Sequence, residues 1–115
     1  MELKELIKDA HENAVKHGFW DEINLLKHNA EFYKGSAITT YNFAIGNMLM
    51  LIVSEVAEAQ DGLRKKDTDN FSEELADVAI RLADLCGGLG INLEYEIEKK
   101  MEKNKLRPYK HGKAF

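Results

Sequence analysis

Cysteine and proline are almost absent from this sequence. Its 115 residues include one cysteine, Cys86, and one proline, Pro108. A lone cysteine excludes a disulfide within the chain, and Cys86 falls in the apolar register of a predicted helix. We therefore expect a small core residue in a reducing compartment rather than a reactive thiol. No signal-peptide pattern opens the sequence, which favours a cytoplasmic location.

Long apolar runs and an excess of positive charge are absent as well. The longest unbroken apolar run, Met48–Val53, is far too short to span a bilayer. The net charge of −4 gives no basic surface of the kind that duplex nucleic acid requires. Hydrophobic residues make up 44% and charged residues 31%, as in ordinary soluble globular proteins. We expect residues 1–115 to form one domain, with neither a membrane nor duplex nucleic acid as a partner.

Helical periodicity covers most of the chain, and no alternating strand pattern is present. Apolar residues recur at helical spacing in four stretches, which are Leu3–Val15, Ile38–Arg64, Phe71–Cys86 and Asn92–Lys105. The segment Phe19–Lys34 mixes apolar and polar residues, and we expect a loop with a short helix there. The sequence thus predicts an all-α, bundle-like fold of four to five helices.

Local signals place some of the helix ends. Asn70 followed by Glu73 resembles a capping box and predicts that a helix starts at Asn70. Three glycines should end this helix, and they are Gly87, Gly88 and Gly90. Gly46 lies inside the long central helix, where glycine costs stability, so it indicates a close helix contact.

Two acidic pairs are the strongest chemical signal. Glu55 and Glu58 form one, Glu74 and Asp77 the other, and the i, i+3 spacing puts both carboxylates of a pair on one helix face. A short turn between antiparallel helices would bring all four together. Such groups near an apolar core repel one another and lose hydration unless a cation compensates. An all-oxygen ligand set suits Mg²⁺, or Mn²⁺ in its place, and hard metals in enzymes usually hold phosphates.

A simpler interpretation of these acids remains open. Glu-x-x-Glu spacing is common in helical proteins, and the acids would then pair with Arg64, Arg81 or lysines on exposed faces. The position of Glu55 argues against this simpler interpretation, because Glu55 projects in the same sector as apolar residues of its helix. Two neighbouring acids, Glu73 and Asp84, point further out, and we expect them to be solvated.

The run Met48–Val53 covers every side of a helix with apolar residues, so this segment should be buried all round. A four-helix protein of this size has difficulty burying one of its own helices completely. Dimerisation through the long central helix is the economical solution. A binding surface or a membrane surface is the alternative.

The C-terminal segment is basic. Lys100, Asn104 and Arg107 are spaced i, i+4 and i+7, so they could line one face of the last helix and its exit. Positive donors opposite a carboxylate–metal cluster are what a polyphosphate ligand requires. The alternative is a frayed basic terminus that aids solubility.

Several stretches together resemble the MazG-like branch of the all-α nucleoside triphosphate pyrophosphohydrolases. They are Gly18-Phe19-Trp20, MLMLIVSEVAEAQDGLR (Met48–Arg64), EELADVAIRLADL (Glu73–Leu85) and the K-x-x-x-N-x-x-R-P-Y-K-H-G tail (Lys100–Gly112). The family's E-x-x-E and E-x-x-D motifs are both complete here. No part of Asp21–Thr40 shows a match, and we expect substrate selection to vary there.

The resemblance implies an oligomer that hydrolyses a nucleoside triphosphate to the monophosphate and pyrophosphate. It implies Mg²⁺ ligation by the four acids, Glu55, Glu58, Glu74 and Asp77. It further implies phosphate or sugar contacts from Lys100, Asn104 and Arg107, supplied by either subunit of a homodimer or a dimer of dimers. Trp20 is a candidate for stacking on the base, against plain core packing beside Phe19. His11, His17 and His28 lack ligand-like spacing and are expected at the surface.

Other functions stay open on the sequence alone. A related pyrophosphohydrolase acting on dUTP or phosphoribosyl-ATP would carry the same acidic motif. A non-catalytic helical dimer, acting as a regulatory or interaction module, would retain the fold and bind metal weakly or not at all. A di-iron carboxylate bundle would need Glu-x-x-His pairs, and the sequence has none. A house-cleaning role against damaged nucleotides follows from analogy alone.

Overall fold

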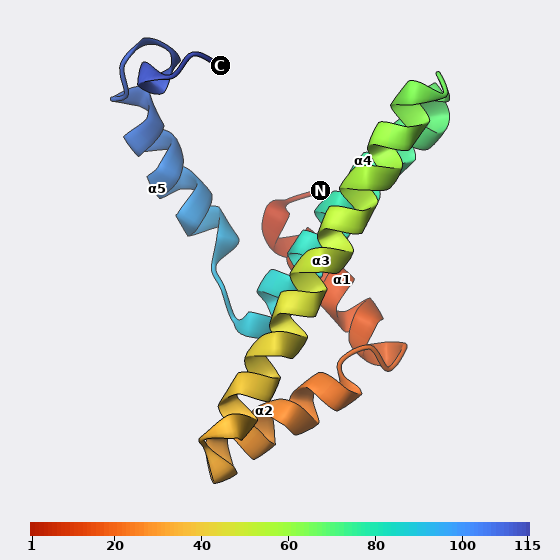
Figure 1. Cartoon of the computed structure of the whole chain (residues 1–115), viewed down its shortest axis with the longest axis vertical. Coiled ribbons are helices and arrows are strands. Elements are labelled where there is room, and N and C mark those ends of the chain that lie inside the picture. The colour runs from red at the N-terminus through yellow and green to blue at the C-terminus, as the bar shows by residue number, and fades with distance from the viewer.

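The computed structural model describes residues 1–115 and contains only helices, which confirms the all-α prediction. Their bounds are α1 Leu3–Lys16, α2 Asp21–Tyr33, α3 Ser36–Arg64, α4 Thr68–Leu89, α5 Leu93–Lys105 and a 3₁₀ turn, Tyr109–Gly112. Figure 1 shows α3 as the long diagonal of the molecule, with α2 at its N-terminal end. Helix α4 packs on both α3 and α1, whereas α5 departs from the other helices.

The expectation of a loop with a short helix over Phe19–Lys34 is wrong, because α2 is helical throughout Asp21–Tyr33. Ile23, Leu26 and Ala30 stand at i, i+3 and i+7 and are the less exposed apolar residues of this helix, which packs on α3. The exposed Phe32 and Tyr33 obscured this narrow stripe in the sequence. Tertiary packing on α3 therefore decides the conformation of the segment.

Both ends of α4 differ from the predicted ones. The helix starts at Thr68, with Asp67 as N-cap, because Asp67 Oδ1 accepts a hydrogen bond from the Asn70 N–H at 3.1 Å. The proposed capping box at Asn70 was therefore wrong by one helical turn. At the other end, Gly87 and Gly88 are still helical, and Gly90 supplies the left-handed C-cap with φ 68°.

Gly87 and Gly88 make room for packing partners instead of ending α4. A Cβ on Gly88 would lie 1.9 Å from Cη2 of Trp20, and a Cβ on Gly87 would lie 2.7 Å from Cβ of His11. Gly46 behaves differently, because no atom beyond its own stretch of helix backbone lies within 4 Å of a Cβ placed there. The close helix contact expected at Gly46 is thus absent within the chain.

The core is small and lies where α4 meets its neighbours. Trp20 is 2% exposed, and the other buried apolar residues are Ala30, Ala59, Ala83, Leu85 and Cys86. The burial of Cys86 agrees with its predicted place in the core, and burial raises the pKa of its thiol. Gly62 of α3 allows the close approach of Asn70 and Phe71 at the start of α4.

The chain on its own exposes far more surface than a compact protein of its size. Its accessible area is 9001 Å², whereas a folded monomer of this mass exposes about 6,400 Å². The radius of gyration is 17.2 Å, against about 13 Å for a compact chain of this length. In the predicted fully buried run, Leu49, Met50 and Val53 are each at least half exposed. Within one chain, the burial expected for Met48–Val53 is therefore not achieved.

By length and composition alone, α3 is also apolar enough to cross a membrane, with a mean hydropathy of 1.4 over its most apolar window. It nevertheless carries Glu55 and Glu58 and packs on two amphipathic helices, α2 and α4. These features make it a central helix of the bundle.

The contact of Gly88 with Trp20 yields a test of this packing. Gly88→Ala should destabilise the protein by about 1–3 kcal/mol, because the new methyl group overpacks the indole. Trp20→Phe alone should also destabilise the protein, but its smaller ring leaves space for the methyl group that Gly88→Ala introduces. The double variant should therefore lose less than the sum of the single losses in urea unfolding. Strictly additive losses would contradict the contact.

Candidate metal centre

Three glutamates meet where α3 and α4 run side by side. Glu55 and Glu58 come from α3 and Glu74 from α4, and one carboxylate oxygen of each lies within 4.8 Å of the others. The turn between the helices is short, and the i, i+3 spacing of Glu55 and Glu58 points both at α4. Glu55 is buried, with only 8% of its surface exposed. The sequence thus correctly anticipated the convergence of three of its four acids.

Asp77, the fourth predicted acid, stands outside this carboxylate cluster. It lies three residues after Glu74 on α4, on the same helix face, and lines the neighbouring cavity. The structure therefore places Asp77 beside the cluster, at the border between the three glutamates and the cavity.

Glu74 is the acid of the cluster whose pKa is raised by the neighbouring carboxylates. The pKa of its carboxyl rises from an ordinary 4.5 to about 7, mainly because a protonated Glu74 can donate a hydrogen bond to Glu55, and further through lost hydration and the charge of Glu58. Its Oε2 atom is buried and has no hydrogen-bond partner. An unpaired acceptor beside two more carboxylates is a position that a cation would satisfy.

Glu55 is perturbed in the opposite direction. Arg81 Nε donates a hydrogen bond to Glu55 Oε1 at 2.7 Å, and this contact holds the pKa of Glu55 below its ordinary value. Arg81 was one of the partners that the simpler interpretation offered for these acids. The pairing occurs, but it reaches only Glu55 and leaves Glu58 and Glu74 without a cation.

The donor set fits a hard divalent cation. All ligand atoms are carboxylate oxygens, they converge from two helices, and one arginine compensates only part of their charge. Mg²⁺ and Mn²⁺ prefer such ligands, while zinc and copper favour nitrogen and sulfur. The Glu55, Glu58 and Glu74 cluster could therefore hold a divalent metal ion.

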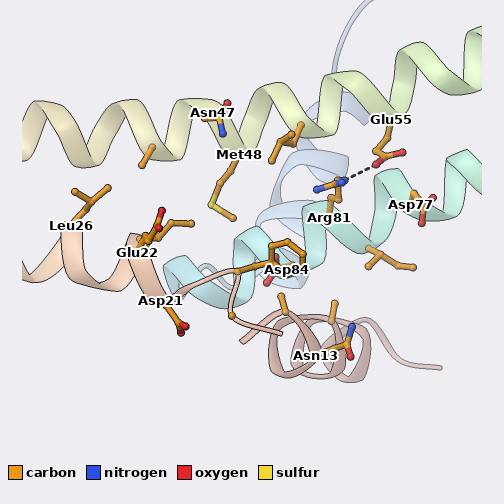
Figure 2. A pocket seen from close by; sticks show the side chains of 18 residues that line it. Asn13, Asp21, Glu22, Leu26, Asn47, Met48, Glu55, Asp77, Arg81 and Asp84 are labelled. Carbon is orange, nitrogen blue, oxygen red and sulfur yellow. Dashed lines mark hydrogen bonds and ion pairs between the residues drawn. The ribbon is translucent and has the colours of Figure 1, made fainter. Parts of the chain in front are cut away.

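A cavity of about 800 Å³ opens beside the cluster (Figure 2). Glu55, Asp77 and Arg81 line the end nearest the carboxylates. Farther along, side chains from α1, α2, α3, α4 and the turn between α1 and α2 line it, among them Asn13, Phe19, Asp21, Glu22, Leu26, Asn47, Met48 and Asp84. The cavity therefore joins a polar, acidic wall to apolar surface.

Trp20 lies in the core. This is the core packing that was given as the alternative to stacking on the base. Its indole N–H donates to Asp84 Oδ1 at 2.8 Å, and its ring packs edge-on against His11. His11 Nδ1 also lies 3.0 Å from Asp84 Oδ1. In this conformation the indole has no free face for a ligand. Phe19, 73% exposed, is instead an aromatic side chain that lines the cavity.

The contacts of Asp84 correct two expectations. It was expected to be solvated and His11 to lie at the surface, yet each is only partly exposed and they contact each other. The sequence distance between α1 and α4 hid this pair. Glycines at positions 87 and 88 were the available signal, since they mark where α4 accepts a close neighbour.

The predicted phosphate-binding residues lie away from the cluster within one chain. Lys100, Asn104 and Arg107 belong to α5 and its exit, and none of them lines the cavity. Arg107 Nη1 contacts His111 Nδ1 at 3.2 Å, and Asn104 Oδ1 is buried without a partner. Figure 1 shows α5 directed away from the helices that carry the acids.

The fold and the site together define the class of protein: an all-α domain with a carboxylate cluster beside a cavity. The family model for the MazG nucleotide pyrophosphohydrolase domain matches residues 43–111. This match covers more than half of the chain, and the protein belongs to this family. Comparisons with curated proteins and with solved structures found no match. The matched range contains both acidic pairs and the basic residues of α5, whereas Trp20 lies outside it.

The raised pKa of Glu74 predicts a pH dependence of stability. A carboxyl with a higher pKa in the folded state favours folding while it is protonated. This contribution should be lost as pH rises from about 4.5 to about 7 in metal-free buffer. Urea unfolding should therefore show wild type losing stability relative to Glu74→Gln across this window. The exposed Glu73→Gln variant is the control, and a flat difference for Glu74→Gln would contradict the crowding of the carboxylates.

Proposed function

We propose that this protein is a Mg²⁺-dependent nucleoside triphosphate pyrophosphohydrolase, with residues 1–115 acting as one domain in the cytoplasm. The observation that supports this most strongly is the glutamate cluster at the end of a cavity, in a chain of the MazG family. A divalent metal would occupy the oxygen-rich end, and the nucleoside would occupy the cavity. A role in clearing unwanted nucleotides is consistent with this activity.

The proposed reaction is attack of water on the α-phosphorus. A bond forms between the water oxygen and phosphorus, the bond from the α-phosphorus to the α,β-bridging oxygen breaks, and pyrophosphate leaves with its electron pair. Bound Mg²⁺, or Mn²⁺, would supply charge neutralisation and a lowered pKa of water. Glu55, Glu58 and Glu74 would hold the cation, with Asp77 as the fourth acid. A spare lone pair on Glu55 or Glu58 takes the proton of the attacking water.

The cavity has the extent that a nucleoside needs. Asp77 and Asp84 both line it and lie seven residues apart on α4, which corresponds to about 10 Å along the helix. Phosphates held near Asp77 would leave the base close to Asp84, Asn47 and Phe19. An aromatic ring and amide groups are suitable partners for a base.

A second copy of the chain should complete the structure. The excess surface of roughly 2,600 Å² over a compact monomer is of the size that a chain gives up in an obligate homodimer. The exposed apolar residues of α3 supply that surface, including Leu49, Met50 and Val53. Helix α5 also exposes Tyr95 and Met101 and makes little contact with its own chain. We therefore propose a homodimer, or a dimer of dimers, built through α3.

The same assembly would bring the basic residues to the substrate. Lys100, Asn104 and Arg107 do not line the cavity of their own chain, and α5 points away from it. In a dimer, α5 of one subunit can lie over the cavity of the other. We propose that these residues contact the phosphates or the sugar from the partner subunit.

The reaction is tested with a panel of canonical and modified nucleotides, with Mg²⁺ and with EDTA. Monophosphate and pyrophosphate should form only with the metal. Glu58→Gln should lower kcat/KM at least about 100-fold, because a metal ligand is lost, while the neighbouring exposed Glu73→Gln should stay near wild type. Orthophosphate as product would place the cleavage at another bond. A folded protein that hydrolyses no nucleotide would favour the non-catalytic module.

The shared site is tested by mixing two inactive variants. Glu58→Gln and Lys100→Ala dimers, unfolded together and refolded at equal amounts, should recover roughly a quarter of the wild-type rate. Half of the dimers are then mixed, and each mixed dimer has one intact site. No recovery would show that both residues act within one chain. Val53→Asp should convert the dimer to a monomer in analytical ultracentrifugation.

A further inference from the structure

Arg81 is the only positively charged side chain that lines the cavity. The other charged residues of the lining are all acids, Asp21, Glu22, Glu55, Asp77 and Asp84. A triphosphate is an anion, and a cavity with this lining repels it before a metal is bound. A single guanidinium in such a place is therefore a chemically distinctive group.

The sequence places Arg81 on the acidic face of α4. Glu74, Asp77 and Arg81 stand at i, i+3 and i+7, so they follow one another along one face of the helix. Figure 2 shows the guanidinium between the Glu55 carboxylate and the open part of the cavity. The Arg81 side chain is 43% exposed, whereas that of Glu55 is 11% exposed. Glu55 is fixed in the core, and Arg81 keeps access to the cavity.

Only one donor of Arg81 is in use. Its Nε binds Glu55 Oε1, and neither terminal nitrogen makes a hydrogen bond. A guanidinium carries five N–H donors and matches the oxygens of phosphate in a bidentate geometry. The terminal nitrogens are thus free to meet a second anion in the cavity.

Glu55 holds Arg81, and the same carboxylate would be a ligand of a divalent cation, so the two cations would compete for it. A divalent ion held by Glu55, Glu58 and Glu74 draws on the same carboxylate charge that now holds Arg81. Once the metal neutralises Glu55, the attraction for the guanidinium weakens. Arg81 would then be less tightly held by Glu55 and would keep its access to the cavity.

We propose that Arg81 binds substrate phosphate, and that its hydrogen bond to Glu55 keeps the guanidinium in the cavity of the metal-free protein, a contact that cation binding to the cluster would weaken. This inference depends on the proposed function and assigns it one further substrate-binding residue. In the metal-free protein, Arg81 limits the repulsion within the carboxylate cluster. In the loaded protein, it donates to phosphate oxygens and stabilises the charge that develops as pyrophosphate leaves.

The first test is the affinity of the substrate-free protein for Mn²⁺ or Mg²⁺ by calorimetry. Arg81→Gln should bind the metal about threefold to tenfold more tightly, because a competing cation is removed. Arg81→Lys keeps the charge and should stay close to wild type. Arg64→Gln, which loses the same group outside the cavity lining, should change the affinity less than Arg81→Gln. Equal or weaker metal binding by Arg81→Gln would overturn the proposal and leave an ordinary structural ion pair.

The second test is substrate binding and turnover. Arg81→Gln should lower kcat/KM about 100-fold, and Arg81→Lys should also lose activity because it lacks the bidentate donors. With metal present, both variants should bind a non-hydrolysable α,β-methylene triphosphate more weakly than wild type. Unchanged binding of this analogue would overturn the role of Arg81 in phosphate binding.

These readouts separate the inference from the proposed function. If wild type hydrolyses no nucleotide, the hydrolase function fails, whereas the metal and analogue titrations still decide the role of Arg81. If wild type is active and Arg81→Gln retains full kcat/KM, the hydrolase function stands and the role of Arg81 fails. Arg81→Lys also guards against misfolding, since it preserves the charge next to Glu55.

Discussion

The packing of α3 against α4 forces three carboxylates together, and much of the structure follows from that constraint. Small residues permit the approach, with Gly62 lying against the start of α4 and Ala59 and Ala83 buried. The close approach places the ligand oxygens of Glu55, Glu58 and Glu74 within 4.8 Å of one another. The chain relieves the repulsion with one arginine and with a proton on Glu74, whose pKa is about 7. A bound divalent cation would replace both at neutral pH.

A second constraint is the shortage of buried surface. One face of α3 carries the acids and packs on α4, while apolar residues on its remaining surface, including Leu49 and Val53, stay exposed. Helix α5 similarly makes little contact with the rest of its own chain. A dimer through α3 would address both problems, because it covers the apolar residues and brings α5 to a cavity. Stability and site assembly would then depend on the same interface.

The helical fold and the acidic cluster could be predicted from the sequence because both depend on local spacing. Periodicity located the longer helices, and the i, i+3 pairs together with the short turn gave Glu55, Glu58 and Glu74. The contacts of Trp20, His11 and Asp84 could not be found in this way, since they join α1, α2 and α4 across long stretches of chain. Likewise, helix α2 is decided by its packing on α3. The sequence offered Arg81 only as one of several partners for the acids, and rotamer geometry pairs it with Glu55.

The central claim is that the three glutamates form a metal site, with Arg81 as the counter-ion in its absence. Its most direct test is a crystal structure of the protein grown with Mn²⁺, with anomalous data measured at the manganese edge. We expect an anomalous peak at ligand distance from the carboxylate oxygens of Glu55, Glu58 and Glu74, with the hydrogen bond from Arg81 to Glu55 broken. No peak at this cluster under saturating Mn²⁺, with that hydrogen bond intact, would contradict it.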